Sequence, residues 1–268
     1  MKTALVTGAT DGIGHETARQ LGALGWRVII HGRNEANAQR AVKALAGAAS
    51  GGSYEPVWGD LSSMREAVEL ARQVLGLAPD LDVLVNNAGV SVGTRTVTED
   101  GFELTMAVNH FAHFLLTHHL LARLRAAPAG RVVTVSSMTH SGGRIDLDDL
   151  AFGKRFDGYG AYSTSKLANV LFTVALAKRL AGSPVTANCC HPGVISTKLL
   201  HSRFGMGGAP VEQGARTSVY LASSPEVASV SGKYFDDCRE VTSARAARDA
   251  QLAEALWDAS ERMLHAFL

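Results

Sequence analysis

The stretch Thr7-Gly8-Ala9-Thr10-Asp11-Gly12-Ile13-Gly14 decides the fold. The apolar run before it (residues 3–7, TALVT) predicts a buried strand, and residues 14–24 after it predict a helix with one apolar face. Glycines between a strand and a helix allow a tight turn and a close approach of the backbone to a pyrophosphate, which the helix N-terminus then faces. We therefore favour a dinucleotide-binding turn over a glycine-rich turn without a ligand.

Apolar runs and amphipathic stretches alternate along the rest of the chain. Strands are expected at 27–31, 54–58, 81–85, 131–136, 185–190 and 232–235, and helices at 35–46, 62–75, 101–124, 160–180, 212–222 and 245–264. Ser62 is the expected N-cap of its helix, and residues 47–53 are expected to form a loop. This alternation predicts a parallel α/β sheet with helices on both faces. We expect one domain, residues 1–268, with insertions at about 139–160 and 199–210.

Composition narrows the function further. The 268 residues include 26 basic and 25 acidic side chains, for a net charge of +1, which argues against nucleic acid as a partner. Three cysteines without framework spacing indicate a reducing compartment. The apolar stretch at the start is too short for a signal peptide or a membrane span. These features predict a cytoplasmic protein with no membrane anchor.

Polar segments follow the predicted strands at their carboxyl ends, where an open α/β sheet binds its ligand. They are Asp60-Leu61, Asn86-Asn87-Ala88-Gly89, Ser136-Ser137 and His191-Pro192-Gly193. Early in the helix at 160–180, Tyr162 and Lys166 share one face because they are four residues apart. A lysine ammonium beside a phenol is expected to lower its pKa, which makes the tyrosine usable as an acid or base.

Taken together, TGATDGIG, DL, NNAG, an asparagine in the following helix, VSS, YSTSK and HPG resemble the short-chain dehydrogenase/reductase family over nearly the whole chain. The segments 108–117, 165–173 and 231–238 are similar to its retinol dehydrogenase-type and WW-domain oxidoreductase-like branch. The resemblance implies a three-layer Rossmann fold with a seven-stranded parallel sheet in the order 3-2-1-4-5-6-7. It also implies an NAD(P)-dependent enzyme that interconverts an alcohol and an aldehyde or ketone.

The same resemblance implies roles for individual residues. Tyr162 would be the catalytic acid/base, and Lys166 would lower its pKa and hydrogen-bond the nicotinamide ribose. Ser137 would hold the substrate oxygen, with Ser136 as the alternative because 25 positions separate Ser137 from Tyr162. Asn109 would support a water-linked proton relay. The expected cofactor-binding residues are Gly8, Thr10, Asp11, Gly12, Ile13, Gly14, Arg33, Asn34, Asp60, Leu61, Asn87, Ala88, Gly89, Tyr162, Lys166, Pro192, Gly193, Val194 and Thr197.

The end of the second strand indicates which cofactor is preferred. An NAD enzyme places an acidic residue there to bind the ribose 2′-hydroxyl, but here Gly32 occupies that position and Arg33 follows. With no carboxylate to repel a 2′-phosphate and a guanidinium available to pair with it, NADP(H) is favoured over NAD(H). Asn34 could assist. The alternative is that Arg33 is only a solvated loop charge.

A small or lipophilic substrate is expected, because the variable segments offer little charge to anchor a ligand. Met138, the loop 139–159 and a lid at 199–210 with Leu199, Leu200, Phe204 and Met206 would form its pocket. His110 and His113 have the spacing of a metal pair, but no carboxylate or cysteine completes a site, so no metal is expected.

Two alternatives stay open at this point. The long helices at 101–124 and 160–180 could pair across a two-fold axis in a homodimer or homotetramer, or the helix beyond Arg245 could cap that surface. The chain could also be a catalytically silent NADP-binding sensor or scaffold. We favour an enzyme, because Asn109, Ser137, Tyr162 and Lys166 are all present.

Overall fold

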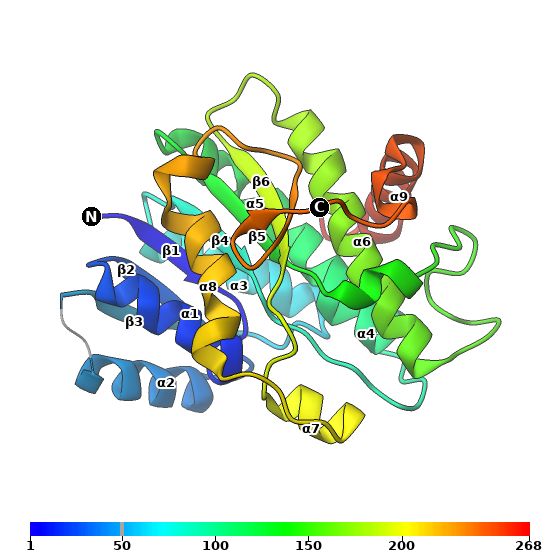
Figure 1. Ribbon diagram of the computed structural model, residues 1–268, viewed down its shortest axis with the longest axis horizontal. Coiled ribbons are helices and arrows are strands. Elements are labelled where there is room, and N and C mark those ends of the chain that lie inside the picture. Colours follow the sequence, from blue (N-terminus) through cyan, green and yellow to red (C-terminus); the bar gives the residue numbers. More distant parts are fainter. Residues whose placement is uncertain (49–50) are drawn as a thin grey trace.

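One β-sheet runs through the centre of the protein (Figure 1). The structure is a computed structural model that describes residues 1–48 and 51–268, without the side chains of Ala48 and Phe204, so the expected loop at 47–53 lies partly outside the described residues. The strands follow the order β3-β2-β1-β4-β5-β6-β7-β8. Their bounds are β1 Thr3–Val6, β2 Arg27–Gly32, β3 Ser53–Trp58, β4 Val83–Asn86, β5 Arg131–Val135, β6 Thr186–His191, β7 Tyr234–Asp236 and β8 Arg239–Glu240.

The expected sheet order is confirmed for the seven parallel strands, but the expected number of strands is wrong by one. After β7 the chain turns at Asp237 and Cys238, which both have positive φ angles, 44° and 61°. This turn brings the two-residue strand β8 back antiparallel to β7. Such a short edge strand has no apolar run of its own, so sequence periodicity did not reveal it.

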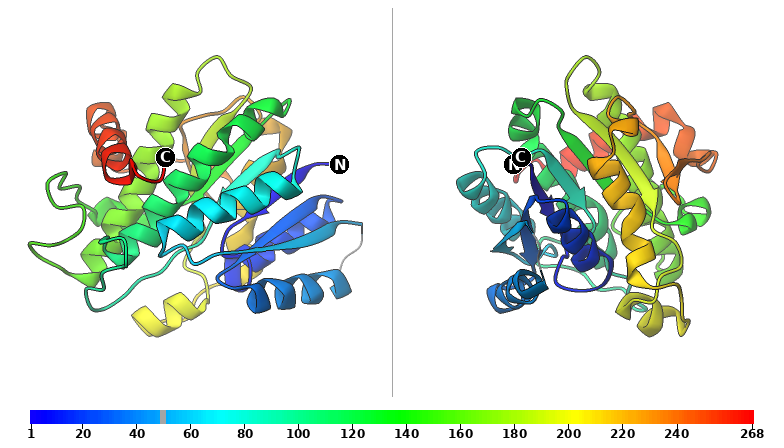
Figure 2. Two further views of the ribbon diagram at one scale, coloured as in Figure 1. Left: turned by 180° about the vertical axis from the view of Figure 1, so that it is seen from behind. Right: turned by 60° about the vertical axis from the view of Figure 1, so that its left-hand side comes forward.

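Helices cover both faces of the sheet, which makes the three expected layers (Figure 2). The first face packs against α1 (Gly12–Ala23), α2 (Glu35–Ala48) and α8 (Val211–Ser223), and the second against α3 (Met64–Leu77), α5 (Ala112–Ala126) and α6 (Gly158–Arg179). Side chains alternate along each strand, so that Ala4 and Val6 of β1 face the first set and Leu5 faces the second. The strands are buried on both sides, which explains their continuous Val/Ile/Leu content.

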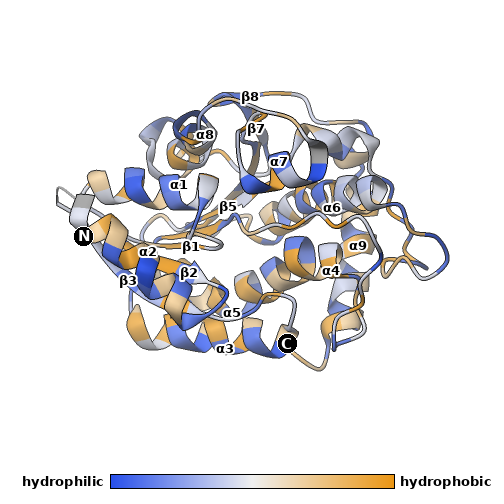
Figure 3. Ribbon diagram, turned by 90° about the horizontal axis from the view of Figure 1, so that it is seen from below, coloured by the Kyte–Doolittle hydropathy of each residue, from blue (hydrophilic) through white to orange (hydrophobic). Residues whose placement is uncertain are grey.

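Helix α3 begins at Met64, two residues later than expected. Ser63, not Ser62, is its N-cap, because the Ser63 hydroxyl accepts from the Glu66 amide at 3.3 Å. The Ser62 amide instead donates to the Asp60 carboxylate at 2.9 Å. Hydrophobic and hydrophilic residues alternate along α3 (Figure 3), and the apolar ones face the sheet.

The predicted helix at 101–124 is not one regular α-helix. It starts with α4 (Leu104–Met106), passes through a π-helical turn (Ala107–Phe111) and continues as α5. Asn109 lies inside the π turn. Turns of this kind occur mainly as single insertions in helices and are frequent at functional sites.

Helix α9 (Ala250–Leu264) lies against α6 (Figure 1). Trp257 stacks on Phe172 of α6, with ring centroids 5.7 Å apart and planes 2° from parallel. The Arg179 guanidinium lies 4.1 Å from the centre of the Trp257 ring, and Arg179 also pairs with Glu254. Among the described residues, no helix combines the length and apolar character needed to cross a membrane.

Replacing Trp257 with alanine removes this stacked and cation–π contact. We expect the variant to lose about 2–3 kcal/mol of unfolding free energy, less than the roughly 3–5 kcal/mol typical of a fully buried aromatic, because Trp257 is half-buried. Chemical denaturation measures the loss. Trp257→Phe serves as the control and should lose much less unfolding free energy. Equal stability of Trp257→Ala and the native protein would show that the contacts of Trp257 with α6 do not stabilise the fold.

Candidate active site

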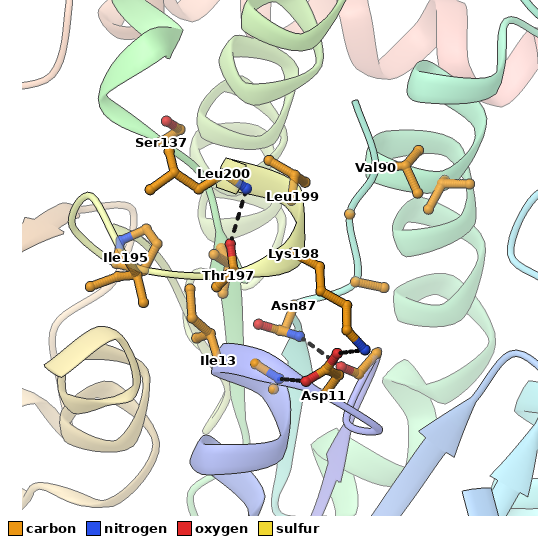
Figure 4. Close-up of a pocket in the computed structure, with 18 of the residues that line it drawn as sticks. Asp11, Ile13, Asn87, Val90, Ser137, Ile195, Thr197, Lys198, Leu199 and Leu200 are labelled. Atoms are coloured by element: carbon orange, nitrogen blue, oxygen red, sulfur yellow. Dashed lines mark hydrogen bonds and ion pairs between the residues drawn. The ribbon is translucent and has the colours of Figure 1, made fainter. Parts of the chain in front are cut away.

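A cavity of about 690 Å³ opens at the carboxyl ends of the parallel strands. It spans the point where β1 has β2 on one side and β4 on the other, which is where open α/β sheets bind ligands. Every residue expected to bind the cofactor lines this cavity, as do Ser137, Tyr162 and Lys166. Figure 4 shows part of the lining, with Asp11 and Ile13 on one side and Thr197, Lys198 and Leu199 facing them.

The glycine turn is packed so closely that only glycine fits at two positions. Gly8 has a φ of +63°, and a Cβ atom there would lie 2.9 Å from the Ala88 Cα atom. A Cβ at Gly14 would lie 2.4 Å from the Gly8 carbonyl oxygen. The Thr7 hydroxyl accepts from the amides of Asn87 (2.8 Å) and Ala88 (3.0 Å) and so fixes β1 to the segment after β4. This cradle fits a pyrophosphate group, which needs a close approach of the backbone.

A charged side chain next to the expected lid segment reaches across the cavity. The helix α7 (Lys198–Phe204), whose N-cap is Thr197, covers the first part of the segment expected at 199–210. Lys198 forms an ion pair with Asp11, the N-cap of α1 (Figure 4). This pair lowers the pKa of the Asp11 carboxyl. Lys198 was not among the expected site residues, because an exposed lysine outside any motif carries no sequence signal.

Tyr162, Lys166 and Ser137 meet at the carboxyl end of β5. The Lys166 ammonium lies 5.6 Å from the centre of the Tyr162 ring and donates to the Val135 carbonyl at 3.0 Å. The Ser137 hydroxyl is hydrogen-bonded to Tyr162. Ser136, the alternative serine, donates its hydroxyl to the Lys166 carbonyl at 2.7 Å. Of the two serines, Ser137 is therefore the one placed beside the phenol.

Burial controls the protonation of these groups. It raises the pKa of Tyr162 to about 12 and lowers the pKa of Lys166 to about 8. The expected lowering of the Tyr162 pKa by Lys166 is thus not found in the protein alone. The reason is that desolvation of the phenol dominates, while the ammonium donates to Val135 rather than to the phenol. At neutral pH Tyr162 is a protonated phenol.

Asn109 lies behind the cavity and does not line it. Its side-chain oxygen accepts from the Val90 amide at 2.8 Å, and its amide nitrogen donates to the Val90 carbonyl at 3.0 Å and to the Ser165 hydroxyl at 2.9 Å. Ser165 in turn donates to the Tyr162 carbonyl. Asn109 therefore connects the segment after β4 to the N-terminal half of α6, which carries Tyr162.

At the other end of the cavity, Arg33 is 68% exposed and lies 3.8 Å from the Asp60 carboxylate. Asn34 accepts from the Asn37 amide at 3.0 Å and so helps to begin α2. Asn37 also lines the cavity, although it follows no recognised motif.

Only part of the expected substrate pocket lines this cavity. Met138, Tyr159, Leu199, Leu200 and Met206 line the cavity. Of the loop 139–159, however, only the end residues Thr139 and Tyr159 reach it. The middle of the loop folds on itself, because the Asp149 carboxylate accepts from the amides of Gly153 and Lys154.

Several of the histidines and two of the cysteines are core residues. His110 bonds to Ser260 at 2.9 Å, and His140 is held between the Ser137 carbonyl and the Ala244 amide. Cys189 and Cys190 are buried thiols. Within residues 1–48 and 51–268, no three His, Cys, Asp or Glu side chains are grouped to hold a metal ion. His31 and His191 do line the cavity, but neither was among the expected cofactor residues.

A doubly wound sheet with a glycine turn at its switch point, and a tyrosine, lysine and serine in the same cavity, defines a dinucleotide-dependent oxidoreductase. The chain belongs to the short-chain dehydrogenase family, whose family model matches residues 2–206. It is 42% identical to retinol dehydrogenase 14 of Homo sapiens, over 98% of this chain and 86% of that protein. It is 40% identical to polyprenol dehydrogenase of Mus musculus, over 96% of this chain and 82% of that protein.

Solved structures agree with this assignment. An uncharacterized protein from Mycobacterium paratuberculosis superposes with a TM-score of 0.84 at 36% identity, covering 99% of this chain and 94% of that one. A candidate NAD(P)-dependent gluconate 5-dehydrogenase from Beutenbergia cavernae, with NADP bound at low occupancy, gives a TM-score of 0.72 at 28% identity, covering 88% and 94%. The chain is thus an NAD(P)-dependent dehydrogenase/reductase of the retinol dehydrogenase-like branch, acting on CH–OH or C=O groups.

Burial of Lys166 should cost stability when no cofactor is present. Below about pH 8 the ammonium is charged in both the folded and the unfolded chain, so folding bears the full cost of desolvating it. Between pH 8 and 10.5 the folded chain loses this charge first, and the cost fades. We expect Lys166→Met to stabilise the cofactor-free protein at pH 7, on the order of 1–3 kcal/mol, with the gain shrinking toward pH 10.

Denaturation of both proteins across this pH range measures the difference. Lys178→Met, at an exposed position on the same helix, is the control and should show no such pH dependence. A gain in unfolding free energy for Lys166→Met that stays constant from pH 7 to 10 would show that the cost does not come from burying the Lys166 ammonium.

Proposed function

We propose that this protein uses NADP(H) to interconvert an alcohol and an aldehyde or ketone on an uncharged, lipophilic substrate, with Tyr162 as the acid/base. The observation that carries the proposal is the meeting of Tyr162, Ser137 and Lys166 in the cavity that also contains the glycine turn. The nicotinamide cofactor supplies or accepts the hydride when it is bound. The protein's own residues manage the proton and the charge on oxygen.

Tyr162 and Ser137 are the proposed donors to the substrate oxygen. During carbonyl reduction negative charge grows on this oxygen, and fixed donors in a buried site stabilise that charge strongly. The Tyr162 hydroxyl carries a proton to donate at neutral pH, because burial raises its pKa to about 12. Ser137 is hydrogen-bonded to the same phenol and is fixed in turn by the Thr139 amide at 3.2 Å, so both donors can face one oxygen atom.

Lys166 and Asn109 support this pair. Nζ of Lys166 lies beside the Tyr162 ring and would hold the nicotinamide ribose. A Cβ at Gly89 would lie 3.5 Å from this Nζ and 3.4 Å from the Asn109 side-chain oxygen, so Lys166 and Asn109 approach the same glycine. The closeness of these groups supports Asn109 as part of a proton relay that leads away from Lys166.

Removing the Tyr162 hydroxyl tests the proton transfer. Tyr162→Phe keeps the ring and its packing but cannot donate a proton, so we expect kcat for NADPH-dependent aldehyde reduction to fall about 10²–10⁴-fold. NADPH affinity, measured by fluorescence titration, should change less than about threefold, because the Tyr162 hydroxyl is not expected to contact the cofactor phosphates. Tyr220→Phe, on α8 and away from the cavity lining, is the matched control. Full activity of Tyr162→Phe would refute the assignment.

The preference for NADP(H) is supported by the space around Gly32. A Cβ there would lie 2.8 Å from the Thr10 methyl carbon and 2.9 Å from the Ala38 amide nitrogen. An acidic side chain at this position, as NAD enzymes require for the 2′-hydroxyl, therefore cannot fit without displacing the backbone. Arg33 is free to turn toward a 2′-phosphate, because its pairing with Asp60 is long and exposed.

Arg33→Ala is the variant that tests cofactor preference. Losing a charged hydrogen bond to the 2′-phosphate should raise KM for NADPH about 10-fold or more, while KM for NADH stays nearly constant. Steady-state kinetics with both cofactors measures the ratio. Arg72→Ala, which removes an exposed arginine on α3, should leave the ratio unchanged. An unaltered ratio in Arg33→Ala would mean that Arg33 is only a solvated charge.

A lipophilic substrate is supported by the lining beyond Tyr162. Met138, Tyr159 and Met206 are large apolar or aromatic side chains that stay about half exposed at the cavity (56%, 49% and 55%). Exposed apolar groups gathered around one cavity indicate a binding site for an apolar partner. The names of the related retinol and polyprenol dehydrogenases agree with substrates of this kind.

A further inference from the structure

His31, at the end of β2, is a buried side chain with both ring nitrogens hydrogen-bonded. Its Nδ1 atom is 3.0 Å from the Gly8 amide nitrogen, and its Nε2 atom is 2.9 Å from the Gly59 carbonyl oxygen. Gly8 follows β1 and Gly59 follows β3, so one imidazole connects the ends of three neighbouring strands. All three residues line the cavity.

Hydrogen-bond chemistry determines the tautomer of His31. The Gly8 amide can only donate, so Nδ1 must accept. The Gly59 carbonyl can only accept, so Nε2 must carry the hydrogen. Burial lowers the pKa of the ring to about 4, and His31 is therefore a neutral imidazole with one defined tautomer at neutral pH.

His31 also holds the next residue of the glycine turn. The ladder between β1 and β2 ends at the pair Val6 and Ile30. Beyond that pair, the His31 carbonyl accepts from the Ala9 amide at 3.0 Å, while its ring accepts from the Gly8 amide. Two consecutive amides of the turn are thus directed toward His31. On its other side, Gly8 packs against Ala88, where no Cβ would fit.

We propose that His31 is a positioning residue for the cofactor: its ring nitrogen Nδ1 holds the Gly8 peptide in the orientation that the pyrophosphate cradle requires. The inference rests on the proposed placement of the cofactor in this cavity. Because the amide of the half-buried Gly8 would otherwise lose its acceptor, loss of Nδ1 should distort the turn. Loss of Nε2 should affect mainly the connection to β3.

Two amide variants separate these roles. His31→Asn places a side-chain oxygen near the position of Nδ1, so it can still accept from Gly8 but no longer reaches Gly59. His31→Gln places its amide near the position of Nε2, so it can still donate to Gly59 but offers Gly8 no acceptor near Nδ1. His31→Ala removes both bonds, and His110→Gln, at a buried histidine away from the cavity, is the matched control.

NADPH affinity, measured by calorimetry on the cofactor-free protein, is the deciding readout. We expect His31→Asn and His110→Gln to bind within about threefold of the native protein, and His31→Gln and His31→Ala to bind about 10-fold more weakly. kcat at saturating NADPH should stay within about threefold in all four variants. Thermal unfolding without cofactor should show similar losses for Asn and Gln, since each keeps one of the two bonds.

Equal weakening by His31→Asn and His31→Gln, or unchanged affinity in His31→Ala, would overturn the proposal. If His31→Gln does not fold, the comparison of His31→Asn with the native protein still decides. A 10-fold loss of NADPH affinity in His31→Asn would show that the Nδ1 contact does not position the turn. Failure of the native protein to bind either NADPH or NADH would instead overturn the placement of the cofactor itself.

Discussion

Close packing of the turn after β1 against the segment after β4 is the constraint on which the rest of the site depends. The Thr7 hydroxyl accepts hydrogen bonds from two amides of that segment, and Gly8 packs against Ala88 with no room for a side chain. These contacts bring two strand ends together at the switch point of the sheet. The cavity, the start of α1 and the place of Lys166 next to Gly89 all follow from this approach.

The catalytic end of the cavity contains groups that burial perturbs. Lys166 is nearly fully buried as an ammonium, and Tyr162 is a phenol with little access to water. A chain selected for stability alone would not bury such groups. Functional sites commonly retain buried ionisable groups although they lower the stability of the fold. The perturbed pKa values of Tyr162 and Lys166 therefore agree with the site that the glycine turn indicates.

Much of the fold could be predicted because it depends on local periodicity. The parallel strands and most helices appear within a few residues of their expected bounds, since a buried strand needs an apolar run and a helix an apolar face. Features that depend on contacts between distant residues were not predictable. The edge strand β8 depends on a turn at Asp237, and the π turn that contains Asn109 is hydrogen-bonded to Ser165 of α6. Lys198 and His31 stand next to segments with expected roles, but only the folded structure shows that their side chains reach the cavity.

By itself, the sequence determined that this is a dinucleotide-binding α/β protein with Tyr162 and Lys166 on one helical face, because turn chemistry and the helical repeat are local properties. The tertiary structure decided how those groups are charged, because desolvation depends on what surrounds a side chain rather than on its neighbours in the chain. For that reason the pKa of Tyr162 is raised where the Tyr–Lys spacing alone predicts that it is lowered. The tertiary structure also decided which of two adjacent serines meets the phenol, since that choice depends on how β5 packs against α6.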